Sequence, residues 1–170
     1  MPPFYDIYGF SKHRDKQTIE KFLTYFCRRD KIENVEGQEI AIYQNDKYKV
    51  EEQFIPVSSL TEVIEFGLKY SNYGFAFYIG KREHYENDIN GVILKFTFDG
   101  KIIFGISVEE HRLSDQGALI DNYDKAIEIE KRIVELTNSA KTSIQFENAP
   151  SDDEEEFDSD IELWGVKRTN

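Results

Sequence analysis

Histidine side chains are the usual carriers of acid–base chemistry near neutral pH, and this 170-residue chain has only three of them. They are His13, His84 and His111. His84 lies in the polar stretch Lys-Arg-Glu-His-Tyr-Glu-Asn-Asp, and His111 directly follows Glu109 and Glu110. Neither histidine has the His-Glu-x-x-His spacing, or a similar spacing, that places metal ligands on one face of a helix. We therefore interpret them as exposed loop residues and predict no metal site.

Other catalytic patterns are also missing from the sequence. No glycine-rich phosphate loop and no Gly-x-Ser-x-Gly turn occurs. The carboxylate pairs Glu51–Glu52 and Glu109–Glu110 fall in expected strands, where adjacent side chains point to opposite faces and cannot flank one bond. We therefore predict that the chain is not an enzyme and needs no cofactor. An enzyme of unrecognised type, using Glu109, His111 or His84, is the alternative that would require a pocket.

The most unusual feature is the acidic run from Asp152 to Glu162, which holds eight carboxylates and no basic residue. It carries about two-thirds of the chain's net charge of −12. An acidic balance disfavours direct binding to nucleic acid or to anionic membranes, and it favours basic partners. The run lacks the glycine and terminal glutamate of a calcium-binding loop. The residues that we expect to contact a partner are Asp152, Asp153, Glu154, Glu155, Glu156, Phe157, Asp158, Asp160, Glu162 and Trp164.

Two interpretations of the acidic run stay open. It is either a solvated loop that adds solubility, as blocks of like charge often are, or a docking surface for a basic partner. In the second case the charge would steer the partner, and Phe157, Ile161 and Trp164 would supply apolar anchors. Trp164 is assigned equally well to the core, where it would hold the C-terminal end in place.

The elements that position these residues follow from the hydrophobic pattern. A stripe at Ile19, Phe22, Leu23, Phe26 and Cys27 predicts a helix from about residue 15, with Cys27 as a small buried hydrophobe. Further helices are expected from residue 59, capped by a serine, and over 117–139. The expected strands are 4–10, 39–43, 48–55, 73–80, 91–98, 102–109 and 142–146, with a further one over 160–166.

The turn at Asp99–Gly100 fixes the pairing of the two strands around it. A three-residue loop pairs Leu94 with Phe104 and keeps both on one face, whereas a two-residue loop would turn Phe104 to the other face. We therefore predict the longer loop, with Gly100 left-handed. The element order predicts an α+β fold, a mostly antiparallel sheet of about six to seven strands with three helices mainly on one face.

The chain is expected to form a single α+β domain over residues 1–150, with an acidic loop and an apolar C-terminal segment over 151–170. Its single cysteine excludes an internal disulfide, and the N-terminus has no secretory signal. No apolar run is long enough to cross a bilayer, so we expect a cytoplasmic protein.

The acidic run, the Trp164–Gly165 pair after it, the size, the charge and the element order together resemble one class of proteins. This class is the immunity proteins of bacterial polymorphic-toxin and contact-dependent growth-inhibition systems. The resemblance implies a stoichiometric inhibitor whose partner is a cognate basic toxin domain, an RNase or DNase, blocked in the cell that makes it. The alternative is an acidic binding module or nucleic-acid mimic for another basic protein, in which phosphorylation of Ser151 and Ser159 would deepen the charge.

Overall fold

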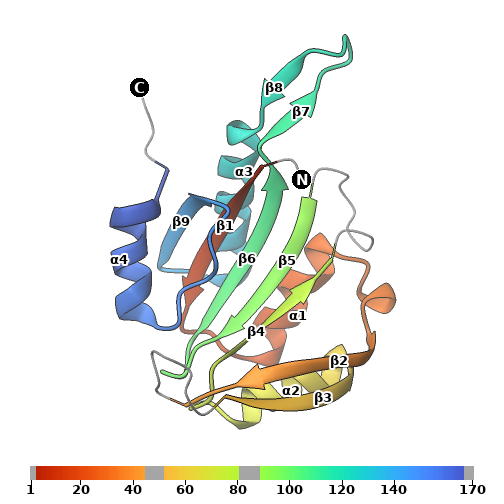
Figure 1. Cartoon of the computed structure of the whole chain (residues 1–170), viewed down its shortest axis with the longest axis vertical. Coiled ribbons are helices and arrows are strands. Elements are labelled where there is room, and N and C mark those ends of the chain that lie inside the picture. Colours follow the sequence, from red (N-terminus) through yellow and green to blue (C-terminus); the bar gives the residue numbers. More distant parts are fainter. Residues whose placement is uncertain (1–2, 45–51, 81–88, 167–170) are drawn as a thin grey trace.

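The computed structural model of the chain describes residues 3–44, 52–80 and 89–166. Within these residues the main sheet is antiparallel and has five strands in the order β4-β5-β6-β1-β9 (Figure 1). These strands are β1 (Phe4–Ser11), β4 (Phe75–Ile79), β5 (Ile89–Phe96), β6 (Ile102–Glu109) and β9 (Lys141–Phe146). Two smaller sheets pair β2 (Asn34–Ile42) with β3 (Gln53–Ser59), and β7 (His111–Leu113) with β8 (Leu119–Asp121).

The helices lie on both faces of the main sheet. The first face is covered by α1 (Lys16–Phe26), α2 (Leu60–Lys69) and α3 (Tyr123–Thr137), whose buried side chains share one core with that face. A short 3₁₀ turn, Arg29–Lys31, follows α1. A fourth helix, α4 (Glu154–Trp164), packs on the second face beside β9 (Figure 1). The α+β class is confirmed, but the sequence analysis predicted only the three helices of the first face.

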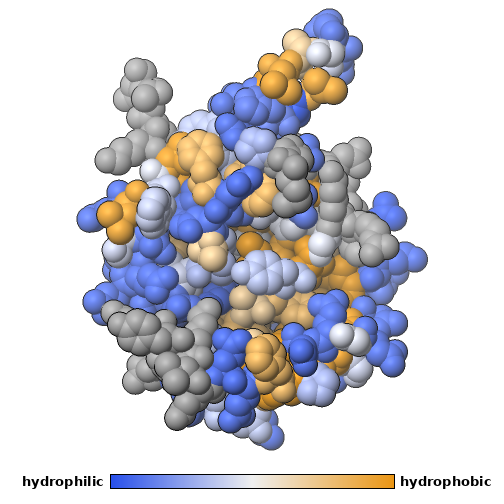
Figure 2. Space-filling view, in the orientation of Figure 1, coloured by the Kyte–Doolittle hydropathy of each residue, from blue (hydrophilic) through white to orange (hydrophobic). Residues whose placement is uncertain are grey.

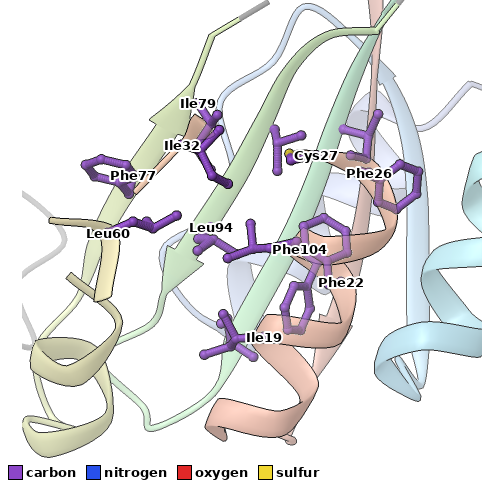
Figure 3. Close-up of a cluster of buried hydrophobic side chains, with 14 of the residues drawn as sticks. Ile19, Phe22, Phe26, Cys27, Ile32, Leu60, Phe77, Ile79, Leu94 and Phe104 are labelled. Carbon is purple, nitrogen blue, oxygen red and sulfur yellow. The ribbon is translucent and has the colours of Figure 1, made fainter. Parts of the chain in front are cut away.

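The first face is built from alternating apolar residues, as the sequence predicts. Leu94 and Phe104 point from β5 and β6 toward Phe22 of α1, and Cys27 is fully buried beside them (Figure 3). The pairing of Leu94 with Phe104 confirms the predicted register. Gly100 has a φ of +84°, a left-handed conformation that suits glycine, so the predicted longer loop is also confirmed.

The helix ends explain why the helices start where they do. Asp15 caps α1 by accepting a hydrogen bond from the backbone N–H of Thr18, and Ser59 caps α2 by accepting one from Glu62. Gly67 lies in α2 where a Cβ atom would come within 2.4 Å of the Phe96 ring. The helix therefore needs glycine at this position, because any side chain would collide with the sheet.

Two sequence predictions about the elements are wrong. The predicted helix over 117–139 begins only at Tyr123, because residues 111–121 form the hairpin of β7 and β8, which projects from the end of the sheet (Figure 1). Its turn depends on Gly117, whose φ is +78° and whose N–H donates to the carbonyl of Ser114. The predicted strand over 160–166 is also wrong, because its residues up to Trp164 belong to α4.

The strands of the smaller sheet differ from the prediction in their extent. The first begins earlier than predicted, at Asn34, and the second ends later, at Ser59. The predicted turn at Asn45–Asp46 lies outside the described residues. The two strands pair with each other and form a separate sheet. This partly explains why the main sheet has five strands and not the predicted six to seven.

Candidate partner-binding surface

The acidic run forms a capped helix. The side chain of Asp153 accepts a hydrogen bond from the backbone N–H of Glu156, and the Glu156 carboxylate accepts one from the N–H of Asp152. Glu154, Glu155 and Glu156 occupy the first turn, where the positive end of the helix dipole stabilises carboxylates. The Asp153-x-x-Glu156 spacing thus resembles a capping box, although the Glu156 carboxylate accepts from the residue before the cap, and this spacing is a sequence signal that could have predicted a helix in place of a loop.

One side of α4 is apolar and faces the sheet. Phe157 is fully buried against Phe10, with ring centroids 5.3 Å apart, and Ile161 follows one turn later. Ile93 and Ile103 complete the cluster from the strands beneath. The expectation that Phe157 contacts a partner is therefore wrong, because its ring already fills a site in the chain's own fold.

Asp152, which immediately precedes the capping residue, holds the start of the helix to the sheet. The ammonium group of Lys95, only 3% exposed, lies 2.8 Å from Asp152. Lys95 also donates a hydrogen bond of 2.6 Å to the Tyr43 hydroxyl, which in turn donates to the same carboxylate. Burial and the hydrogen bond to Asp152 raise the pKa of Tyr43, so it stays a neutral donor. Asp152 is therefore part of the fold.

Two further lysines face the helix from the sheet. Glu154 lies 2.7 Å from Lys101 and 3.0 Å from Lys141, and Lys141 also lies 2.8 Å from Asp158. The hydrogen bonds from Lys101 and Lys141 lower the pKa of Glu154, and those to Asp158 and Glu154 raise the pKa of Lys141. The acidic run is thus partly neutralised by basic residues that are distant from it in sequence.

The remaining carboxylates differ in their surroundings. Asp160 accepts a hydrogen bond of 2.6 Å from the Ser151 hydroxyl. Burial raises the pKa of Glu156, and the charges of Asp152 and Asp160 raise it further. In the described part of the chain, Glu155 and Glu162 have neither an ion pair nor a side-chain hydrogen bond. These two carboxylates are the ones left to act on a partner.

The outward side of α4 combines charge with exposed apolar surface. Glu155, Glu162 and Leu163 recur at helical spacing on this side, and Leu163 is 67% exposed. Trp164, at the end of the helix, is 58% exposed. The assignment of Trp164 to the core is therefore wrong, and its ring is free to contact a partner. We call Glu155, Asp158, Glu162, Leu163 and Trp164 the outer face of α4.

A cavity of about 620 Å³ adjoins this outer face. It lies between α3, β9 and the end of α4, and Glu130 and Glu162 bring carboxylates to its wall. Thr142 and Ser143 add hydroxyl groups from β9, which is an edge strand of the main sheet. The outer face therefore borders a hollow whose wall carries two carboxylates and two hydroxyl groups beside apolar side chains such as Ile144 and Ile161.

The other sequence candidates do not form a site together. His111 begins the projecting hairpin and Glu109 ends β6, whereas His84 lies outside the described residues. His13 lies 3.2 Å from the side-chain nitrogen of Asn138 at the surface. Within the ranges that the structure describes, no group of three His, Cys, Asp or Glu residues is placed to hold a metal ion.

Two features of the surface were missed by the sequence analysis. Leu113 and Leu119 pair across the projecting hairpin and are both largely exposed, giving the apolar patch on the projection in Figure 2. A pocket also opens on the second face of the sheet around Asp6, a residue that sequence alone places in an ordinary strand.

Comparison with known proteins identifies no relative. No protein-family model, no curated protein and no solved structure matches the chain. None of the helices in the described residues has the length and apolar character that crossing a membrane requires. The functional argument therefore rests on the geometry and chemistry of the surface itself.

Proposed function

We propose that the protein is a non-catalytic immunity protein, a stoichiometric inhibitor that binds a basic toxin domain of the nuclease type in the cytoplasm. It would block the active site or the substrate groove of that toxin. The observation that carries the proposal is the outer face of α4, where Glu155 and Glu162, which have no ion pair among the described residues, lie close to exposed Leu163 and Trp164. Negative charge draws a cationic protein in, and an exposed tryptophan supplies contact energy once it arrives.

The division of labour within α4 supports a role in binding. The inner side holds the helix in place through Phe157 and the lysine contacts of Asp152 and Glu154. A helix fixed in this way presents its outer face without having to order itself on binding, which reduces the entropy lost in the complex. The outer face of α4 is therefore already ordered before a partner arrives.

The choice of a nuclease follows from charge complementarity. An enzyme that holds nucleic acid needs lysine and arginine side chains around its substrate groove, because it must neutralise phosphates. An anionic helix, beside a hollow to which Glu162 brings a carboxylate, is the complementary surface. The lysines that contact Glu154 and Asp158 argue against the alternative of a nucleic-acid mimic, since a mimic gains nothing from neutralising its own charges.

Co-expression with a cognate toxin tests the proposal. The candidate partner is the basic C-terminal domain of a large exported protein encoded next to this chain. We expect the two proteins to co-purify in equal amounts and the complex to lack nuclease activity that the toxin domain shows alone. If the toxin domain stays active in the presence of excess inhibitor, the proposed function is wrong.

A pair of matched variants tests whether the outer face is the contact. Glu155→Gln/Glu162→Gln removes two charges from α4, and Glu39→Gln/Glu65→Gln removes two from exposed sites on β2 and α2. Both double variants have the same net charge, so any difference reports the position of the charges. We expect only the α4 variant to slow association and to weaken its dependence on salt. Equal slowing by both variants would place the contact elsewhere.

A further inference from the structure

A second pocket, of about 350 Å³, opens on the second face of the main sheet. Asp6 and Tyr8 of β1 and Ser107 of β6 line it, and Tyr78 of β4 and the segment after β9 form its sides. This face of the sheet is the one turned to the viewer in Figures 1 and 2, with α4 at its left edge. We call this cavity the Asp6 pocket.

Asp6 is buried, and the described part of the chain brings no cation to it. Its side chain is 4% exposed, one carboxylate oxygen accepts a hydrogen bond from the Ser107 hydroxyl, and the other accepts one of 2.8 Å from the backbone N–H of Asn148. Within residues 3–44, 52–80 and 89–166, no lysine, arginine or histidine forms an ion pair with it. Lys95, on the same face of the sheet, is engaged with Asp152 instead.

A buried carboxylate without a cation is energetically unfavourable unless something compensates the charge. Burial raises the pKa of Asp6 to about 6, against the lowering effect of its two hydrogen bonds, and Glu147 raises it further. At neutral pH the group is therefore still mainly ionised. Each of its oxygens keeps a lone pair beyond the hydrogen bond it already accepts, so the pocket has the capacity to bind a donor.

The walls of the pocket suit a planar cation. Tyr8, Tyr78 and Phe4 supply aromatic rings, and Tyr78, on the edge strand β4, is 56% exposed. Aromatic faces attract cations, and a guanidinium group can stack on a ring while it donates hydrogen bonds to a carboxylate. An ammonium group would gain the charge contact but not the stacking.

We propose that the Asp6 pocket receives the guanidinium group of an arginine side chain of the basic partner, stacked against Tyr78 and paired with Asp6. The proposal rests on the proposed inhibitor function and adds a second contact to it. The pocket and α4 share one face of the sheet, and they are joined by the segment from Asn148, which donates to Asp6, to Asp153, which caps α4. One cationic surface could therefore reach both.

Titration with a small probe tests the pocket without any partner. N-acetylarginine methylamide is added to the full chain at pH 8, and binding is followed by the NMR signals of the residues around the pocket. We expect these signals to shift, and we expect Asp6→Asn to abolish the shift. N-acetylcitrulline methylamide has nearly the same shape without the charge and should not bind. Equal binding of the two probes, or equal binding to Asp6→Asn, would overturn the proposal.

The pH dependence of probe binding identifies the group responsible. The titratable groups that face Asp6 are Glu147, Tyr8 and Tyr78, and the two tyrosines have raised pKa values that keep them neutral. With Asp6 about one-tenth ionised at pH 5, we expect probe binding about tenfold weaker there than at pH 8. Glu147→Gln should keep this dependence. If it removes the dependence, Asp6 is not the group that binds the cation.

A cation from the chain itself is the competing occupant. Lys81 and Arg82 follow Gly80 at the side of the pocket and lie outside the described residues. We expect Lys81→Gln/Arg82→Gln to leave both probe binding and the Asp6 titration unchanged. A raised Asp6 pKa or tighter probe binding in this variant would show that the chain fills its own pocket, which would overturn the proposal.

The partner complex separates the two proposals. If the toxin domain binds the wild-type chain at least about tenfold more tightly than Asp6→Asn, both the function and the pocket are supported. If the toxin domain binds both chains equally, the inhibitor function stands and the role of the pocket in it fails. If the probe binds but the toxin domain is not inhibited, the cation site stands and the inhibitor function fails.

Discussion

The two faces of the main sheet differ in what they bury. Apart from Ser11 at the end of β1, the strand residues buried on the first face are apolar, and three helices cover that face. The second face buries only a small apolar cluster together with polar and charged side chains. These buried polar side chains are Asp6, Lys95, Ser107, Ser143 and Gln145.

This difference separates the groups that stabilise the fold from the groups that the proposed function uses. The first face gains free energy simply by removing apolar surface from water. Buried polar groups on the second face are unfavourable unless each one finds a partner. Lys95 pairs with Asp152 and so holds the start of α4, whereas no basic residue of the described ranges pairs with Asp6 beside its pocket. The second face therefore carries a buried carboxylate, Asp6, whose presence is not explained by a gain in stability.

Equivalent truncations on the two faces should have the largest effects on stability. Phe104→Ala empties a fully buried site between β6 and α1, and we expect it to lower the free energy of unfolding by about 4 kcal/mol. Phe157→Ala truncates an equally buried ring in the smaller cluster, so we expect a loss of about 3 kcal/mol. Urea denaturation of both variants measures the two losses.

The two variants should also differ in which part of the fold they loosen. Phe157→Ala should detach α4 while the first face stays intact, so hydrogen exchange should rise mainly in α4. Phe104→Ala should raise exchange throughout the sheet. A Phe157→Ala variant that unfolds as one unit with the whole domain would show that the two faces are not separable.

Asp6 makes the second face sensitive to pH. Its folded-state pKa of about 6 lies above its ordinary value of 3.8, so the folded state binds more protons than the unfolded state between these values. Stability from this group is therefore highest below pH 4 and falls as pH rises through 6, by about 3 kcal/mol in total. Asp6→Asn should gain stability relative to the wild type as pH rises from 4 to 8.

Paired denaturation curves at several pH values test this prediction. Other carboxylates titrate in the same range in both proteins, so the difference between the two curves isolates Asp6. Two stability curves that run parallel from pH 4 to 8 would show that Asp6 has an ordinary pKa. That result would also remove the pH argument for the Asp6 pocket.

Lys95 should contribute less to stability, because its partner is not fully buried. Lys95→Met leaves Asp152 and the Tyr43 hydroxyl without the ammonium group, and we expect a loss of about 2 kcal/mol, below the range for fully buried pairs. Adding Asp152→Asn should restore part of the loss, because no unpaired charge is then left. If the double variant is less stable than Lys95→Met, charge compensation is not what Lys95 provides.

The sequence predicts the first face well because its information is local. The alternation through Leu94 and Phe104 and the stripe through Ile19 and Phe22 each specify an element within a few residues. The register of the β5–β6 hairpin follows from the same pattern, since only one loop length keeps both strands facing one core.

The second face could not be predicted in this way. The acidic run was interpreted as a loop because like charges repel, but Lys95, Lys101 and Lys141 reduce that repulsion from positions far away in sequence. The spacing of Asp153 and Glu156 is a local helix signal, but it lies within a run of like charges that is more typical of a loop. The Asp6 pocket has no local signal, because it forms only where separate segments meet.

Trp164→Ala should change stability least among these variants and should weaken partner binding strongly. Trp164 is largely exposed, so Trp164→Ala should change the free energy of unfolding by less than about 0.5 kcal/mol. If its ring fills a site on the partner, the same variant should weaken binding by about tenfold or more. Calorimetry of the toxin complex measures the second effect.

Phe54 provides the matched control for this variant. It is an aromatic residue with similar exposure on β3, which belongs to a smaller sheet and not to the main sheet that carries α4 (Figure 1). Phe54→Ala should leave both stability and binding nearly unchanged. If Trp164→Ala destabilises the chain instead, Trp164 supports the fold, and the contact energy on the outer face of α4 must come from Leu163 and the carboxylates. If both variants weaken binding equally, the partner covers more of the molecule than the second face, and the separation of stability from recognition fails.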